Sequence, residues 1–360
     1  MRKAYIADIA DEGGTYRYLF LSAVILILLA ACRGDRVGWD ILGTASGGGG
    51  YQKGLFLGAL ASDSFIDYLR WSYEEPIYSV ITYLAAKCGH MFFAHLFNMM
   101  IIIIPIYIIL WDVRHDYDPA YSLAVFLFVY YGQGYNIVRQ AMAISIVMLS
   151  VWMFSKEKYL WSAVLFAVAI GIHYSAVVGL ITIILYYVSI SRFRNIYRIL
   201  MVVALITGTF FFRQIMQVFL RLLPFVKSNY FSRRALFSTD GDISATSLIL
   251  SIISLIMIVT LSEWNTGSFL NRTFLLYIMI ILFLSIPIGG QMGYARRAFR
   301  YFDRYFMFTL PLLFKFIPND DGNQTLGKIM FYGMLMLYWI AFYFFVGSQG
   351  IVPYYPFWGE

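Results

Sequence analysis

Long apolar runs recur along the whole chain and constrain its fold more than any other feature. The runs are 18–32, 90–111, 119–133, 136–154, 159–172, 174–190, 197–212, 246–262, 272–288, 302–317 and 328–346. One membrane-spanning helix needs about 20 apolar residues, so these runs predict an all-α polytopic integral membrane protein with about 11 transmembrane helices. Only 13% of the 360 residues are charged, against roughly 25% in soluble domains. An ordinary soluble enzyme, a disordered protein and a disulfide scaffold are therefore excluded.

Polar segments interrupt what we predict to be a single transmembrane domain, residues 1–360. The longest, 33–75, is predicted to be a periplasmic loop with an interfacial helix, because its apolar side chains could share one helical face. The apolar residues that follow are too many for one helix and too few for two. We therefore predict a short re-entrant or half helix at 76–88 before a full span at 90–111. A second periplasmic loop is predicted at 213–245.

The basic residues lie in the turns between the apolar runs, and the chain carries a net charge of +7. Lys156 and Lys158 mark one cytoplasmic turn, and a basic cluster after residue 190 marks another. Counting helices from these turns places both polar loops outside, provided that 76–88 does not cross. The outer basic residues are then the larger set and are mostly arginines. Either this topology is inverted, or the outer arginines bind an anion such as a phosphate, which guanidinium groups favour.

Arg139 lies near the start of the apolar run 136–154. An arginine close to membrane depth is costly unless it meets an anion. Asn136 and Gln140 add hydrogen-bond donors beside it, and the first turn of a helix offers free N–H groups to a phosphate. The alternative is an arginine that extends its side chain to the membrane interface. The pattern favours an anion-binding site.

His173 and Glu75 are two candidates for proton transfer. His173 stands between two apolar runs, and histidine exchanges protons near neutral pH. A lone histidine is more often structural, and His173 has no evident acidic neighbour in the sequence. Glu75 precedes Pro76, which suits the first position of a helix. The carboxylate of Glu75 either stabilises that helix N-terminus or takes part in catalysis.

Asp40 is a third candidate, in a charged cluster with Arg33, Asp35 and Arg36 that follows the first apolar run. Such a cluster could form an interfacial network of salt bridges. It could equally present carboxylates to a sugar. The sequence leaves both interpretations open.

A basic and aromatic segment leads into the run 302–317. On one helix, Arg297, Arg300 and Arg304 would share a face, and Tyr305 follows directly. A run of charges is ordinarily a solvated surface. Because this one continues straight into apolar residues, binding of a pyrophosphate or a glycan is the favoured interpretation.

Several motifs of soluble enzymes are absent from the sequence. It contains no Walker-type phosphate loop, no metal-binding spacing of His and Cys, and no nucleophile elbow. The basic residues build no domain for nucleic acid. We therefore expect no cofactor, no metal and no nucleic-acid partner, and any sugar donor must be presented at the membrane.

A series of short motifs resembles the EpsG family, the Wzy-like polymerases and membrane glycosyltransferases of bacterial exopolysaccharide and O-antigen assembly. The motifs cover most of the chain, and their order and spacing carry the resemblance. They are Arg33 with Gly38-Trp39-Asp40 and Tyr51, Glu75-Pro76-Ile77-Tyr78, Asn136-x-x-Arg139-Gln140-x-x-Ala143, His173-Tyr174-Ser175-Ala176, Arg304-Tyr305 and Val352-Pro353-Tyr354-Tyr355.

The resemblance implies a metal-independent, multi-pass enzyme of the bacterial inner (cytoplasmic) membrane, with its active site facing the periplasm. It would look like the membrane-embedded, lipid-dependent glycosyltransferases. It would transfer a growing glycan from undecaprenyl pyrophosphate to a hydroxyl group of an incoming lipid-linked repeat unit. The implied partners are the lipid bilayer and undecaprenyl-pyrophosphate-linked glycans, and they could include a chain-length regulator and a flippase.

This reaction assigns roles to the candidate residues. The leaving pyrophosphate needs cations, and the acceptor hydroxyl needs a base. The cations are expected at Arg139 and on the Arg297/Arg300/Arg304 face, and the base at His173, Asp40 or Glu75, in that order. Further substrate contacts are expected from Arg33, Asn136, Gln140 and Tyr305.

Two other functions remain as alternatives. A flippase or transporter of lipid-linked oligosaccharides would also need buried arginines, but it is expected to show internal repeats, and the sequence shows no convincing one. An O-antigen ligase-type transferase is the alternative within the enzyme class. An acyltransferase would place His and Asp together on the cytoplasmic side.

Overall fold

The computed structural model describes residues 12–42, 50–72, 74–191, 270–291, 295–317 and 320–359, with scattered residues between 196 and 256. The chain divides into two compact units. The first unit comprises Met1–Val177 and Ile317–Glu360, and the second comprises Val178–Phe316. Almost all of the predicted loop 213–245, and most of the runs 197–212 and 246–262, lie outside the described residues. A single transmembrane domain over the whole chain stays a prediction.

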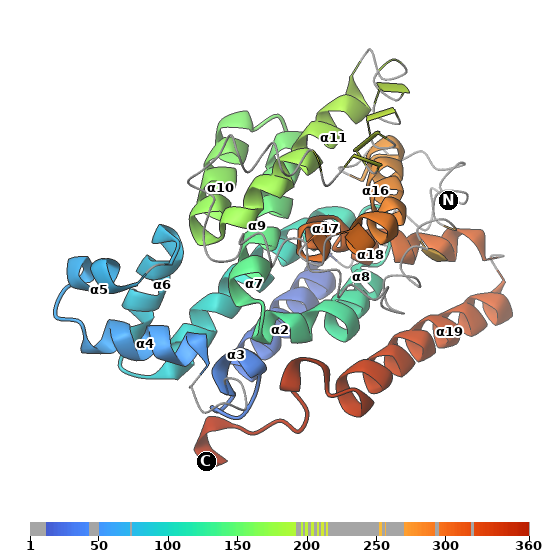
Figure 1. The fold of residues 1–360 in the computed structure, drawn as a ribbon. Helices are drawn as coiled ribbons and strands as arrows, with labels where there is room; N and C mark the ends of the chain where they lie inside the picture. Colours follow the sequence, from blue (N-terminus) through green and yellow to red (C-terminus); the bar gives the residue numbers. More distant parts are fainter. Residues whose placement is uncertain are drawn as a thin grey trace. The chain divides into compact units, whose positions relative to one another are not determined.

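The first unit is built from helices and short helical turns (Figure 1). Its α-helices are α2 (Glu12–Ala31), α3 (Trp39–Leu42), α4 (Tyr51–Ala61), α5 (Phe65–Trp71), α6 (Pro76–Lys87), α7 (Met91–Val113), α8 (Pro119–Val125), α9 (Val138–Ser155), α10 (Tyr159–Ile172) and α19 (Asp321–Trp339). After α8 the chain continues through a π-helical turn, η1 (Phe126–Tyr130), and a 3-10 turn, η2 (Tyr131–Tyr135). A π-helical segment, η8 (Ile340–Phe345), likewise extends α19.

The helices follow the apolar runs of the sequence, which confirms the prediction of an all-α membrane protein. Four helices are long and apolar enough to cross a membrane: Gly14–Ala31, Met91–Val113, Val138–Ser155 and Asp321–Phe345. The number of about 11 transmembrane helices stays a prediction. Two other apolar helical segments, Tyr159–Ile172 and Tyr174–Ile190, are shorter than a full span. The apolar segment Arg272–Ser285 belongs to a helix of 20 residues that ends at Gln291.

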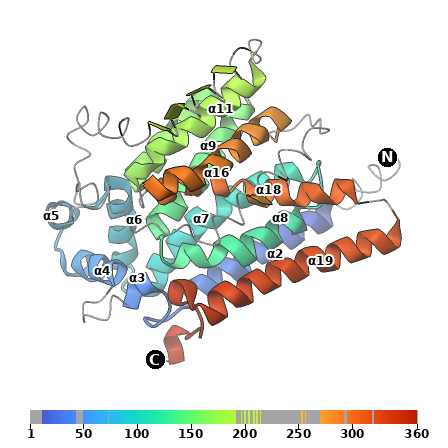
Figure 2. The same ribbon diagram turned by 45° about the vertical axis from the view of Figure 1, so that its right-hand side comes forward.

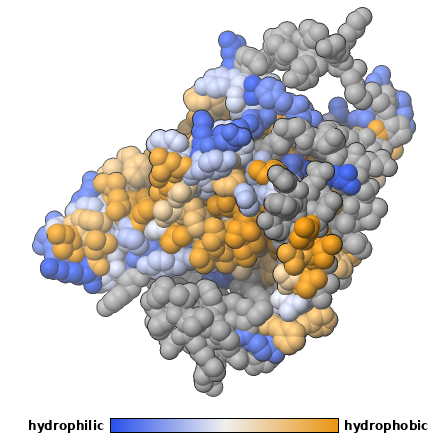
Figure 3. Space-filling view, turned by 90° about the horizontal axis from the view of Figure 1, so that it is seen from above, coloured by the Kyte–Doolittle hydropathy of each residue, from blue (hydrophilic) through white to orange (hydrophobic). Residues whose placement is uncertain are grey.

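Helices α7 and α9 form the interior of the first unit. Helix α7 packs against both α2 and α9 (Figure 2). Helix α10 packs along α9. Helices α2, α10 and α19 instead expose large apolar side chains such as Ile25, Leu160 and Leu337. In Figure 3, patches of hydrophobic residues occupy the middle of the view, and hydrophilic patches lie beside them. In a bilayer, apolar side chains face the lipid, and polar side chains pair with one another inside the protein.

The first unit has two distinct ends along its long helices. At one end, which we call the site end, Arg33 after α2 contacts His95 near the start of α7 and the Tyr135 carbonyl before α9. At the far end, Tyr16 packs on Trp111, and Asp112 accepts hydrogen bonds from Trp152 and Lys156. Helices α2, α7 and α9 therefore run between the same two ends.

Helix α6 begins and finishes at the site end. Glu75 before it contacts Arg139 at the start of α9. Lys87 at its other end is followed by His90, whose ring packs on Phe357 of the C-terminal tail. The N–H of Phe357 in turn binds the carbonyl of Cys32 at the end of α2. The 12 residues of α6 rise about 18 Å, short of the roughly 30 Å hydrocarbon core, so α6 is too short to cross a bilayer alone. Its re-entrant path in a membrane stays a prediction.

Residues 33–75 contain α3, α4 and α5. The apolar side chains that the sequence could place on one helical face are divided between α4 and α5, with Ser64 capping α5. Leu57, Leu60 and Ile66 are exposed, whereas Phe56 is buried. The location of these helices at a membrane interface stays a prediction.

The C-terminal tail binds the segment that follows α2. Gly34 N–H donates to the Tyr355 carbonyl at 2.8 Å, and Gly38 N–H donates to the Gly350 carbonyl at 2.8 Å. Gly38 has a φ of +99°, and a Cβ there would lie 3.1 Å from Oδ1 of Asn136. A glycine is therefore needed where the Gly38-Trp39-Asp40 motif meets Asn136, so the tail and this motif form one local structure.

The second unit contains α11 (Leu180–Ile190), α16 (Arg272–Gln291), α17 (Ala295–Asp303), α18 (Phe306–Thr309) and a 3-10 segment, η7 (Leu310–Phe316). Helix α16 packs against α11 and α17. The ring of Phe274 lies between those of Tyr186 and Tyr305, at centroid distances of 5.4 and 5.2 Å. Asn271 donates to Ser189 at 2.8 Å. These contacts give the second unit its own core.

Candidate functional site

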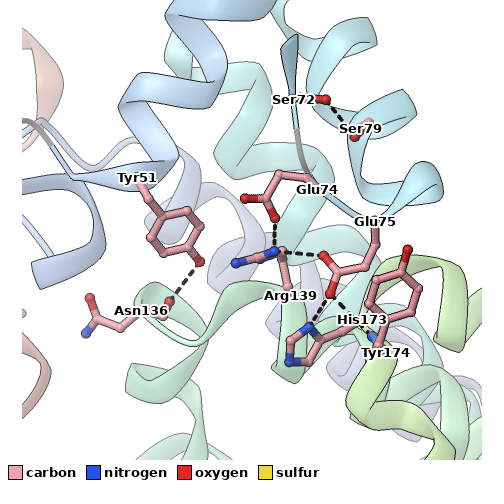
Figure 4. A network of polar contacts seen from close by, with 9 residues as sticks. All are labelled: Tyr51, Ser72, Glu74, Glu75, Ser79, Asn136, Arg139, His173 and Tyr174. Carbon is pink, nitrogen blue, oxygen red and sulfur yellow. Dashed lines mark hydrogen bonds and ion pairs between the residues drawn. The ribbon is translucent and has the colours of Figure 1, made fainter. Parts of the chain in front are cut away.

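Arg139 is the centre of a polar cluster at the site end of the first unit (Figure 4). It lies in the first turn of α9, and its Nη1 donates to Oε2 of Glu75 at 2.7 Å and forms an ion pair with Glu74. Its guanidinium group also lies over the rings of Tyr51 and Tyr78, at 5.1 and 5.6 Å from their centroids. The anions that this arginine meets in the folded chain are therefore two of the protein's own carboxylates.

Glu75 links Arg139 to His173. It occupies the N-cap position of α6, with Pro76 at the first helical position as the sequence predicts, but its side chain makes no capping hydrogen bond. Glu75 therefore caps α6 by its position and charge, without a side-chain hydrogen bond. Only 5% of the side chain is exposed, and a carboxylate buried to this extent needs charged and hydrogen-bonding partners. Arg139 and His173 supply them.

His173 follows the last turn of α10, and its Nδ1 lies 2.7 Å from Oε1 of Glu75. The backbone N–H of Tyr174 donates to the same oxygen at 3.3 Å. A carboxylate paired with arginine can only accept, so Nδ1 carries the proton and Nε2 of the neutral ring holds a lone pair. The side chain is 27% exposed. His173 is thus an oriented histidine whose second nitrogen is suited to accept a proton.

No acidic residue stands near His173 in the sequence, whereas the structure places Glu75 against it. Glu75 lies 98 positions earlier in the chain, and Arg139 lies 64 positions after Glu75. Periodicity describes neighbours within one helix, whereas these three residues come from the start of α6, the start of α9 and the end of α10. Only the packing of the helices brings them together.

Asp40 lies in α3, beside the same cluster. Burial raises the pKa of Asp40, while hydrogen bonds from Tyr51 and Gln52 and the charges of Arg139 and Arg33 oppose that rise. The same hydroxyl of Tyr51 lies 3.4 Å from the Asn136 carbonyl, so its one proton is shared between these two acceptors. The four candidate catalytic residues, Arg139, Glu75, His173 and Asp40, are thus gathered at the site end. Their catalytic roles stay predictions.

Asn136 and Gln140 flank Arg139 but are turned to other partners. The Asn136 amide donates to the carbonyl and the side-chain oxygen of Gln349, at 2.5 and 2.9 Å. Its Oδ1 accepts from the backbone N–H of Asp40 at 3.1 Å. Gln140 is buried in α9. In this structure Asn136 joins the first loop to the C-terminal tail, and substrate binding by Asn136 or Gln140 stays a prediction.

Arg33 is buried, with 3% exposure. It donates to the Tyr135 carbonyl at 3.1 Å, to Oε1 of Gln52 at 3.3 Å and to Nδ1 of His95 at 3.0 Å. No carboxylate contacts it among the described residues, and burial lowers the pKa of Arg33 to about 10. Its Nη1 and Nη2 groups donate to the chain itself, and its buried Nε has no hydrogen-bond partner within the described residues. Substrate binding by Arg33 stays a prediction.

Replacing Arg33 with alanine is expected to destabilise the first unit by about 2–4 kcal/mol, because the Tyr135 carbonyl, Gln52 and His95 would lose their donor in a buried position. Thermal unfolding of the detergent-purified protein measures this effect. Arg70→Ala is the matched control, since Arg70 is 77% exposed and contributes little. Equal unfolding temperatures for the two variants would contradict the assignment.

The predicted Arg297/Arg300/Arg304 face is partly wrong. Helix α17 ends at Asp303, so Arg304 lies in the turn beyond it. Arg297 is exposed, whereas Arg304 is buried and lies 4.0 Å from Asp303. Tyr305 is fully buried in the core of the second unit. All four belong to the second unit, and their contact with substrate stays a prediction.

Some residues of the cluster were not singled out as candidates from the sequence. Tyr51, Tyr78 and Tyr174 stand within the short motifs, and Glu74 adjoins Glu75 in the sequence. Their motif positions were the available signal. The described residues contain no group of three His, Cys, Asp or Glu side chains placed to hold a metal ion.

Comparison with known families gives one finding. The family model described as the EpsG family matches residues 16–355 of the chain. No curated protein and no solved structure matches the chain at a significant level.

Proposed function

Because the chain belongs to the EpsG family of polysaccharide polymerase-like membrane proteins, we propose that it joins lipid-linked repeat units into a polysaccharide. The donor is a glycan on undecaprenyl pyrophosphate, and the reaction takes place at the outer face of the bacterial inner membrane. The observation that carries this proposal is the chain of contacts from Arg139 through Glu75 to His173.

The reaction uses these groups as follows. A hydroxyl oxygen of the acceptor sugar attacks the anomeric carbon of the donor glycan, and its proton passes to Nε2 of His173. The bond between the anomeric carbon and the pyrophosphate oxygen breaks, and its electron pair stays on that oxygen. The products are the lengthened glycan and undecaprenyl pyrophosphate. Glu75 holds the imidazole ring and stabilises its positive charge, in the manner of the acid in a catalytic triad.

The leaving pyrophosphate gains negative charge as the bond breaks. A guanidinium group near the membrane, where water is scarce, stabilises such a charge strongly. Arg139 is the cation next to His173, and its side chain is 12% exposed.

The proposed orientation rests on the short basic connections at the far end of the first unit, and not on the total number of basic residues, which is larger on the site side. Arg114, Lys156 and Lys158 lie at the far end, in the connections after α7 and α9. Short loops rich in Lys and Arg favour the cytoplasmic side. The site end then faces the periplasm, where lipid-linked repeat units are polymerised.

The test is a reconstituted assay. Purified protein in liposomes is mixed with undecaprenyl-pyrophosphate-linked repeat units, and the products are separated on a ladder gel. We expect multi-repeat glycans and release of undecaprenyl pyrophosphate. Movement of the lipid across the bilayer without lengthening would favour a flippase or transporter, and transfer of a glycan to a different acceptor would favour a ligase-type transferase.

The proposed reaction needs no metal, because Arg139 supplies the positive charge and His173 the base. Treatment with a strong chelator is therefore expected to leave the lengthening rate unchanged in the same liposomes. A loss of activity that a divalent cation restores would contradict this part of the proposal.

A further inference from the structure

The two carboxylates that face Arg139 are held in different ways (Figure 4). Glu75 has three contacts, with Arg139, with His173 and with the backbone N–H of Tyr174. Glu74 has one partner among the described residues, Arg139, whose Nη1 contacts its buried Oε2. Its side chain is 19% exposed, against 5% for Glu75. Glu75 is thus held by three partners, whereas displacement of Glu74 breaks its contact with one.

The electrostatic balance of the cluster opposes an anionic ligand. One guanidinium faces two carboxylates, so Arg139, Glu74 and Glu75 together carry one negative charge when ionised. Like charges placed side by side cost several kcal/mol in a desolvated site. A pyrophosphate can approach Arg139 favourably only if one of the carboxylates withdraws.

The guanidinium group still has donors for a second anion. Both carboxylates contact the same atom, Nη1 of Arg139. Its Nη2 and Nε donate no hydrogen bond within the described part of the chain. An arginine contacts phosphate best through two parallel N–H groups, and removal of Glu74 would leave such a pair beside the contact with Glu75.

We propose that the carboxylate of Glu74 occupies the place at Arg139 that the pyrophosphate of the substrate takes on binding. It neutralises Arg139 while the site is empty, and the pyrophosphate displaces it on binding. Glu75 stays in place and keeps both Arg139 and His173 oriented. This inference rests on the proposed function, because it assigns the ligand of the same arginine. It makes Glu74 a residue that sets the affinity for the donor.

The direct test is binding of inorganic pyrophosphate to the full-length, detergent-purified protein by calorimetry. Glu74→Gln removes the competing charge with little change of shape and is expected to tighten binding about tenfold. Glu74→Asp retains the charge and should bind like the unaltered protein. Asp67→Asn removes a carboxylate charge from exposed helix α5 and is the matched control. Arg139→Ala should abolish the binding.

A second readout is the lengthening assay, in which the KM for the lipid-linked donor should fall about tenfold in Glu74→Gln and by more than any change in kcat. Unchanged or weaker pyrophosphate binding in Glu74→Gln would overturn the inference, even if the protein lengthens glycans. If Glu74→Gln binds pyrophosphate more tightly but no variant lengthens glycans, the displacement of Glu74 by pyrophosphate would be supported and the proposed polymerase activity would be contradicted. The experiments therefore distinguish a failure of the polymerase proposal from a failure of the proposal for Glu74.

Discussion

Replacing Arg139 with alanine is expected to abolish glycan lengthening in liposomes. Loss of one preorganised charge-stabilising group costs about 10²–10³ in rate. The change also leaves the buried Glu75 carboxylate without its cation, and an uncompensated buried charge costs about 3–5 kcal/mol of stability. The initial rate of lengthening measures the first effect, and thermal unfolding measures the second.

Two variants separate these effects. Arg139→Lys retains a positive charge for Glu75 but lacks the two parallel donors for a phosphate, so it should recover stability more than activity. Arg70→Ala removes an exposed arginine of the same unit and should change neither. Normal glycan lengths made by Arg139→Ala would show that Arg139 is not at the reacting centre.

Replacing His173 with alanine is expected to reduce the lengthening rate by about 10²–10⁴, the usual contribution of a general base. The side chain is partly exposed at the end of α10, so the fold should persist. His115→Ala is the matched control, because His115 is an exposed histidine beyond α7. The measurement is the initial rate at saturating donor.

The role of Glu75 is tested by the same assay. Glu75→Gln cannot stabilise a charged His173, and its effect should be close to that of His173→Ala. If the two residues act as a unit, the double variant should be no slower than the slower single variant. Additive losses would mean that Glu75 and His173 act independently.

The helices could be predicted because they depend on local patterns. The run 159–172 coincides with α10, and the run 136–154 is within two residues of α9. Pro76 marked the first residue of α6 correctly. Each of these features is written in consecutive residues, since apolar runs and proline act on the backbone where they stand.

The connections within the site could not be predicted in this way. The carboxylate of Glu75 was expected to cap its helix or act in catalysis, and nothing in the neighbouring residues shows that it reaches Arg139 and His173. The end of α17 at Asp303 removes Arg304 from the helix that a regular spacing predicts. Both results come from tertiary packing, which overrides the local preference of a segment.

The central claim is that this chain itself lengthens a lipid-linked glycan through Arg139 and His173. The most direct measurement compares the unaltered protein with the Arg139→Ala/His173→Ala double variant, each in liposomes with undecaprenyl-pyrophosphate-linked repeat units, on one ladder gel. The account predicts a ladder of multi-repeat products from the unaltered protein and single repeats alone from the double variant. A ladder from the double variant, or single repeats alone from both proteins, would contradict it.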